Sequence, residues 1–143
     1  MSKFSERLAE LISERDLNEK EFAEKSGVCA SCVSFYLQEK SMPTVESLVK
    51  IADYCNCSTD FLLGREEENK SDKFKVCPPF CEQILFLKKH FNCSAYQIYH
   101  NTDIAKSCYY DWLSGSRQPN LDNIIRLAEH FDCSIDFILG REV

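Results

Sequence analysis

The sequence predicts an all-α protein of two small domains, each built from five short helices. Two observations predict this fold class. The chain matches itself without a gap when residues 4–66 are set against residues 80–142. Within each copy, apolar residues recur at helical spacing, and no segment reads as a strand. We therefore predict domains at residues 1–66 and 80–143, joined by a linker over residues 67–79.

The internal repeat carries the domain assignment. Sixteen of its 63 aligned pairs are identical. In the first copy the identical positions are Phe4, Glu6, Leu11, Ser31, Cys32, Leu37, Pro43, Ala52, Cys57, Ser58, Asp60, Phe61, Leu63, Gly64, Arg65 and Glu66. A gapless match of this length indicates one structural unit present twice, and two copies are too few for a solenoid.

The first two helices of each unit follow from periodicity and capping. Residues 4–12 carry an apolar stripe, with Ser2 or Ser5 as the N-cap. Asn18 followed by Glu21 predicts a capping box at the start of the second helix. Gly27 ends that helix.

The remaining three helices are shorter or begin at clear turn signals. A third helix runs from about Cys29 to Gln38, and a fourth opens at Pro43 and Thr44. In the fifth segment, CSTDFLLG, the serine is the N-cap and the aspartate favours the positive helix end. Its phenylalanine and leucine fill the core, and its glycine ends the helix in a left-handed conformation. The linker segment EENKSDKFKVCPP is charged and ends in two prolines.

Composition limits the environment of the protein. The net charge is −6, and neither half is basic, which is unusual for a nucleic-acid-binding protein. No stretch approaches the roughly 20 apolar residues that cross a membrane. The first residues, MSKFSERLAELISE, are charged and periodic, unlike a signal peptide. We expect a cytoplasmic protein with no membrane partner.

The nine cysteines are odd in number and irregularly spaced, which favours free thiols. Cys29 and Cys32 could supply two zinc ligands, but no second pair supplies the other two. We therefore predict no metal and no cofactor. The chain has no glycine-rich phosphate loop and no nucleophile within a recognisable catalytic motif, so we also predict that it is not an enzyme.

Two longer segments carry a family resemblance. They are NEKEFAEKSGVCASCVSFYLQEKSMPT in the first copy and KSCYYDWLSGSRQPNLDNIIRLA in the second, each followed by an FLLG-like ending. Both resemble the Cro/Xre family, the phage-repressor class of helix-turn-helix DNA-binding domains. The resemblance implies two tandem lambda-repressor-like domains, each with its third helix in the major groove of DNA.

The resemblance also implies a set of DNA-contacting positions in each copy. In the first copy they are Ala30, Ser31, Ser34, Phe35 and Gln38 on the helix, with Lys40 and Ser41 near phosphate. In the second copy they are Lys106, Ser107, Tyr110, Asp111 and Ser114 on the helix, with Ser116 and Arg117 near phosphate.

Both copies depart from the family pattern. Glu19 and Ala95 stand where the family has a glutamine that holds phosphate, and Glu19 would repel it. The first recognition face lacks arginine and lysine, the commonest readers of guanine. The second copy has Lys106 and Arg117, although Asp111 opposes phosphate. We expect the second copy to bind DNA more strongly.

These observations lead to two functional hypotheses. The first is a sequence-specific transcriptional regulator whose partner is a double-stranded DNA operator and whose two domains add avidity. The alternative is a protein–protein interaction module in which one or both domains have lost DNA binding. Exposed Phe35 and Tyr110 would then meet a protein partner or the second subunit of a homodimer.

Overall fold

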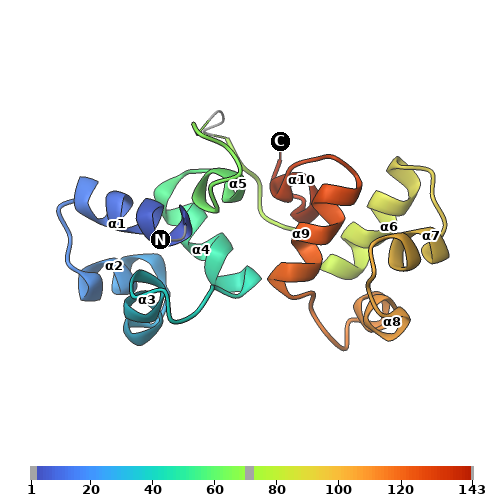
Figure 1. Cartoon of the computed structure of the whole chain (residues 1–143), viewed down its shortest axis with the longest axis horizontal. Coiled ribbons are helices and arrows are strands. Elements are labelled where there is room, and N and C mark those ends of the chain that lie inside the picture. The colour runs from blue at the N-terminus through green and yellow to red at the C-terminus, as the bar shows by residue number, and fades with distance from the viewer. Residues whose placement is uncertain (1–2, 70–72, 143) are drawn as a thin grey trace. The chain divides into compact units, whose positions relative to one another are not determined.

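The structure is a computed structural model that describes residues 3–69 and 73–142 (Figure 1). The first five helices are α1 (Lys3–Glu14), α2 (Glu19–Ser26), α3 (Ala30–Leu37), α4 (Val45–Cys55) and α5 (Thr59–Leu62). The other five are α6 (Phe80–His90), α7 (Ala95–Asn101), α8 (Lys106–Ser114), α9 (Leu121–His130) and α10 (Ile135–Leu139). The chain divides into two compact units between Phe74 and Lys75. The predicted all-α fold with two five-helix copies is confirmed.

Helix caps form where the side chains predict them. The Asn18 side chain accepts from the Glu21 backbone N–H at 2.8 Å, and the Glu21 carboxylate accepts from the Asn18 N–H at 3.2 Å. This is the predicted capping box. Gly27 follows α2 in the left-handed region, with φ of 83°. Ser58 caps α5 by accepting from the Phe61 N–H at 2.9 Å.

Two predictions about individual residues are wrong. Ser5 is not an N-cap, because α1 already begins at Lys3 and Ser5 is buried inside the helix, donating to Glu39. The other candidate cap, Ser2, lies outside the described residues. Phe61 does not fill the core. It is half-buried, and the Arg7 guanidinium lies 4.0 Å from the centre of its ring, while Leu62 is the fully buried residue.

The core of each unit is centred on larger apolar or aromatic side chains at six equivalent repeat positions. Each of these side chains has no measurable exposure, and together they come from all five helices of the unit. They are Leu8, Phe22, Val33, Leu48, Ile51 and Leu62 in the first unit, and Ile84, Ile98, Tyr109, Ile124, Leu127 and Ile138 in the second. Full burial of one such side chain is worth about 1.5–3 kcal/mol. The repeat therefore encodes one packing scheme twice.

The first and last helices of each unit are joined by a hydrogen bond at equivalent positions. Arg7 donates to the Phe61 carbonyl at 2.7 Å in the first unit. Gln83, at the same repeat position, donates to the Phe137 carbonyl at 3.1 Å in the second. Different side chains therefore add a second donor to the same carbonyl, which also accepts from the backbone N–H of Gly64 or Gly140.

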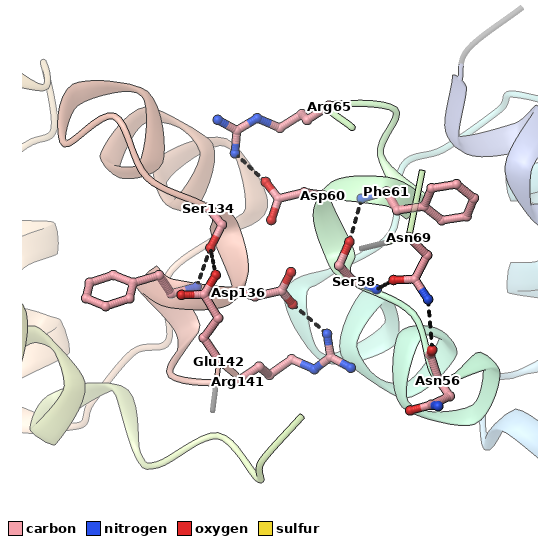
Figure 2. Close-up of polar contacts among 11 residues, drawn as sticks. Asn56, Ser58, Asp60, Phe61, Arg65, Asn69, Ser134, Asp136, Arg141 and Glu142 are labelled. Atoms are coloured by element: carbon pink, nitrogen blue, oxygen red, sulfur yellow. Dashed lines mark hydrogen bonds and ion pairs between the residues drawn. The ribbon is translucent and has the colours of Figure 1, made fainter. Parts of the chain in front are cut away.

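An aspartate–arginine ion pair closes each unit (Figure 2). Arg65 contacts the Asp60 carboxylate at 2.9 Å, and Arg141 contacts Asp136 in the same way. The second pair is deeper, because the Arg141 side chain is 0% exposed whereas 30% of the Arg65 side chain is exposed. Sequence reasoning assigned the aspartate to the helix end only and missed its partner.

Both ends of the predicted linker bind to their own units. The Asn69 side chain accepts from the Ser58 N–H at 3.1 Å and donates to the Asn56 carbonyl at 3.2 Å (Figure 2). The Lys75 N–H donates to the Arg141 carbonyl at 2.9 Å. Residues at both ends of the 67–79 segment thus form part of the folded units. None of the described helices is long and apolar enough to cross a membrane.

Asp136→Asn is expected to lower the free energy of unfolding of the second unit by about 3 kcal/mol or more. The substitution removes the Asp136 charge that faces the buried Arg141 guanidinium. Trp112, the single tryptophan of the chain, lies in the second unit and reports its unfolding by fluorescence in a urea titration. Asp60→Asn is the matched variant, followed by circular dichroism, and its loss should be smaller because Arg65 reaches water. Equal losses in both units would contradict the difference in burial.

Tyr109→Phe is expected to raise the stability of the second unit by about 1 kcal/mol. Among the described residues, the Tyr109 hydroxyl is buried with no hydrogen-bond partner, and such a group costs free energy on folding. Burial also raises the pKa of the Tyr109 phenol. The same Trp112 titration measures the change, and a loss of stability would show that the hydroxyl is satisfied.

Candidate nucleic-acid interface

The second and third helices of each unit pack against one another across a tight turn. In the first unit Gly27 takes φ of 83°, and Val28, directly after it, is buried. In the second unit Asp103 occupies the glycine position with φ of 58°, and Ile104 is buried. Aspartate tolerates this backbone region better than most residues. The turn therefore survives the loss of glycine, and the third helix is held in the same way in both units.

The third helix of the first unit, α3, presents an uncharged face. Ala30, Ser31, Phe35 and Gln38 are exposed, and Phe35 retains 46% of its accessible surface. Ser34 is half-buried and accepts a hydrogen bond from the Gln38 amide at 2.9 Å. Two of the predicted polar readers are thus bonded to each other.

The loop after α3 supplies the only predicted cation of this surface. Lys40 and Ser41 are exposed, and the Lys40 N–H donates to the Phe35 carbonyl at 2.9 Å. Glu39, in the left-handed region with φ of 60°, turns the chain at this point and accepts from Ser5. The loop is therefore held against both α3 and α1.

The third helix of the second unit, α8, presents a cation and an aromatic ring. Lys106 is its first residue, and Lys106, Ser107, Tyr110 and Ser114 are exposed. Tyr110 retains 47% of its accessible surface. Cations and hydroxyl groups on such a face can donate to phosphate or to base edges.

Asp111 organises the loop that follows α8. Its backbone carbonyl accepts from the Ser116 N–H at 3.1 Å and from the Ser114 hydroxyl at 3.1 Å. Its carboxylate lies 3.7 Å from the Arg117 guanidinium, an ion pair whose arginine side chain is 77% exposed. Such an exposed pair is weak, so Arg117 can exchange this carboxylate for another anion. The pairing also offsets the negative charge that Asp111 adds to the surface.

Glu19 and Ala95 occupy equivalent places in the two units, each as the first residue of the second helix. Glu19 is exposed there, where a carboxylate stabilises the helix N-terminus. The same charge repels phosphate. This end of α2 is therefore suited to helix stability rather than to anion binding.

The structure also reveals surface groups that sequence reasoning did not single out. Tyr96 on α7 is 57% exposed and stacks on His100 at 4.8 Å between ring centres. Tyr99 lies 5.7 Å from Tyr96 and 6.4 Å from Tyr110, so an aromatic surface runs from α7 to α8. The i, i+3 and i, i+4 spacing of these rings in AYQIYH was the signal that could have found them.

Each unit therefore carries a helix-turn-helix whose third helix is exposed on one side and buried on the other. All of the predicted positions lie on α3, on α8 or in the loops after them. All are exposed except Ser34 and Asp111, which are half-buried.

Comparison with known proteins supports the assignment of both units to the helix-turn-helix class. The helix-turn-helix family model matches residues 8–62 and 87–138, more than half of the chain. The chain belongs to this family, of the Cro/Xre type that its sequence resembles.

Several relatives share this similarity. The chain is 34% identical over 61 residues to the HTH-type transcriptional regulator YobD of Bacillus subtilis, a match covering 43% of this chain and 54% of YobD. It is 33% identical over 67 residues to the HTH-type transcriptional regulator ImmR of the same organism, covering 47% and 53%. These matches span about half the length of each relative. A crystal structure of a transcriptional regulator from Listeria innocua has 29% identity and a TM-score of 0.38, covering 50% of this chain and 64% of that one.

Proposed function

We propose that the chain is a sequence-specific DNA-binding transcriptional regulator whose second unit makes the stronger contact with DNA. The observation that carries the proposal is the exposed face of α8. Lys106, Ser107 and Tyr110 are exposed on one side of α8. Tyr109 and Trp112, on the other side of the same helix, are buried in the core. The regulatory role is supported by the family and by the named relatives.

The chemistry of α8 fits the edge of a duplex groove. The Lys106 ammonium can donate to a guanine edge or to a phosphate, and the Ser107 hydroxyl can donate or accept. The Tyr110 ring can pack on a thymine methyl group. Arg117 supplies the remaining positive charge. Its guanidinium can leave the Asp111 carboxylate and bind a phosphate of the DNA backbone.

The first unit has a weaker equivalent of the same surface. The α3 segment ASCVSFYL has no charged side chain, so its contribution rests on Ser31, Phe35 and Gln38. Such contacts read shape and thymine methyl groups rather than guanine. We propose that this unit adds specificity and avidity to a site that the second unit anchors.

The double substitution Lys106→Ala with Arg117→Ala is expected to weaken DNA binding by roughly 30-fold or more. Each lost contact is worth about 1–3 kcal/mol. The measurement is the affinity for the duplex that the wild-type chain enriches from a random-sequence pool. The slope of log affinity against log salt should also become shallower by one to two, because fewer counterions are released.

The matched control is Lys88→Ala with Lys89→Ala, at the end of α6, which removes the same charge away from the predicted surface. Equal losses in the two double variants would show that only net charge matters. Failure of the wild-type chain to retain any duplex at low salt would overturn the proposed function itself.

Asp111→Asn is expected to strengthen binding to random-sequence duplex about fivefold at low salt. The substitution removes a carboxylate that faces phosphate and frees Arg117 from its ion pair. Titration of labelled duplex with the variant and the wild-type chain measures the change. A loss of affinity confined to the enriched sequence would instead indicate that the Asp111 carboxylate accepts a hydrogen bond from a cytosine.

A further inference from the structure

Two thiols stand together at the start of α3. Cys29 is the N-cap residue of this eight-residue helix, and Cys32 lies one turn further along. Cys29 is exposed and Cys32 is half-buried. The Cys29 sulfur lies 2.8 Å from the Ser31 hydroxyl oxygen.

The surroundings of Cys29 favour its thiolate form. The Ser31 hydroxyl, together with the backbone N–H groups and the thiol at the start of α3, lowers the pKa of the Cys29 thiol to about 7. A free cysteine has a pKa of about 8.5. The Cys29 thiol is therefore more readily ionised at neutral pH than an ordinary cysteine, and the thiolate is the reactive form.

Other thiols of the chain lack this combination of exposure and pKa. Cys55 and Cys57 are buried, and burial raises the pKa of Cys55. Burial likewise raises the pKa of Cys93. In the second unit the Cys32 position is kept as Cys108, but Ala105 stands where Cys29 stands. The paired arrangement at the start of the third helix thus belongs to the first unit.

We propose that Cys29 and Cys32 form a redox-active dithiol site, with Cys29 as the attacking thiol and Cys32 as the resolving thiol, oxidised by hydrogen peroxide. The assignment concerns thiol chemistry and does not depend on DNA binding. Ala30 and Ser31, two predicted DNA-contacting residues, lie between the two cysteines. The proposed modification site therefore adjoins the predicted DNA-contacting surface of α3.

The oxidation proceeds in two balanced steps. The Cys29 thiolate attacks one peroxide oxygen, the O–O bond breaks, and the departing hydroxide takes up a proton to become water. Cys29 is left as a sulfenic acid. The Cys32 thiol then attacks the Cys29 sulfur, forming the S–S bond as the S–O bond breaks, and its proton leaves with the hydroxyl as a second water. Two thiols are oxidised, and one peroxide is reduced.

Closing this bond requires an adjustment of the backbone at the start of α3. Side chains three residues apart on a helix have Cβ atoms about 5–6 Å apart, and a disulfide requires about 4 Å. Cys29 precedes the helix, with φ of −59° and ψ of 138°, so its backbone is not fixed by helical hydrogen bonds on both sides. The adjustment moves the first turn of α3 and releases Ser31 from its contact with Cys29.

The test uses the full, reduced chain treated with one equivalent of hydrogen peroxide, then with N-ethylmaleimide under denaturing conditions, then with trypsin. The tryptic peptide 26–40 contains Cys29 and Cys32 and no other cysteine, and peptide 51–65 contains Cys55 and Cys57. We expect peptide 26–40 to lose two hydrogen atoms and to take up no maleimide, while peptide 51–65 takes up two. Equal oxidation of both peptides, or a reduced peptide 26–40, would overturn the proposal.

Single substitutions separate the two thiols. Cys32→Ala should leave a sulfenic acid on Cys29 that dimedone traps, whereas Cys29→Ala should leave Cys32 reduced. Ala105 occupies the position of Cys29 in the second unit, so alanine is compatible with the start of this helix. Cys108→Ala is the matched control and should leave the oxidation of peptide 26–40 unchanged. Dimedone trapping on Cys32 in the Cys29→Ala variant would show that Cys29 is not the attacking thiol.

The pH dependence of alkylation gives an independent readout. The rate at which iodoacetamide labels Cys29 in the reduced chain, read from tandem mass spectra of peptide 26–40, should rise with pH and reach half of its maximum near pH 7, because only the thiolate reacts. Ser31→Ala should move this midpoint to higher pH, since it removes the largest cause of the lowered pKa. A midpoint near that of a free cysteine in both proteins would contradict the proposed activation of Cys29.

Discussion

The aspartate–arginine ion pair at the end of each unit is the interaction on which the rest of the fold depends. It ties the short final helix to the chain that leaves it, and the first helix binds the same short helix through Arg7 or Gln83. Units of this size have little core to spare, so a loosened final helix would expose a large share of it. The closed core in turn supports α3 and α8 from behind, through Tyr36 and Trp112.

On this shared scaffold, the two units differ where the third helix meets solvent. The segment CASC begins α3, and AKSC stands at the same place before and within α8. One unit therefore presents a thiol and the other an ammonium group one residue further on. Both changes are compatible with one packing scheme, because the core positions Val33 and Tyr109 face inward. Surface chemistry has diverged while burial has been kept.

The net charge of −6 is less decisive than it first seems. Charge acts on a partner through the groups that face it, and nearby charges matter most because salt screens distant ones over about 8–10 Å. On α8 and its loop, Lys106 and Arg117 outnumber Asp111, whereas α3 carries no charge and its loop sets Lys40 beside Glu39. The two units thus offer different electrostatic surfaces within one acidic chain.

The sequence by itself determined the helices, their caps and the duplication, because these depend on local spacing and on side chains near in the chain. The capping box at Asn18 and the cap at Ser58 follow from such patterns. The positions expected on the outer faces of α3 and α8 came from the family resemblance, and most of them are exposed. Only the tertiary structure decided which polar groups meet. The pairing of Asp136 with Arg141, the bond from Arg7 to the Phe61 carbonyl and the solitary hydroxyl of Tyr109 depend on how the helices pack. Packing also decides burial, which raises the pKa of the Cys55 thiol, whereas the Ser31 hydroxyl and its neighbours lower the pKa of the exposed Cys29 thiol.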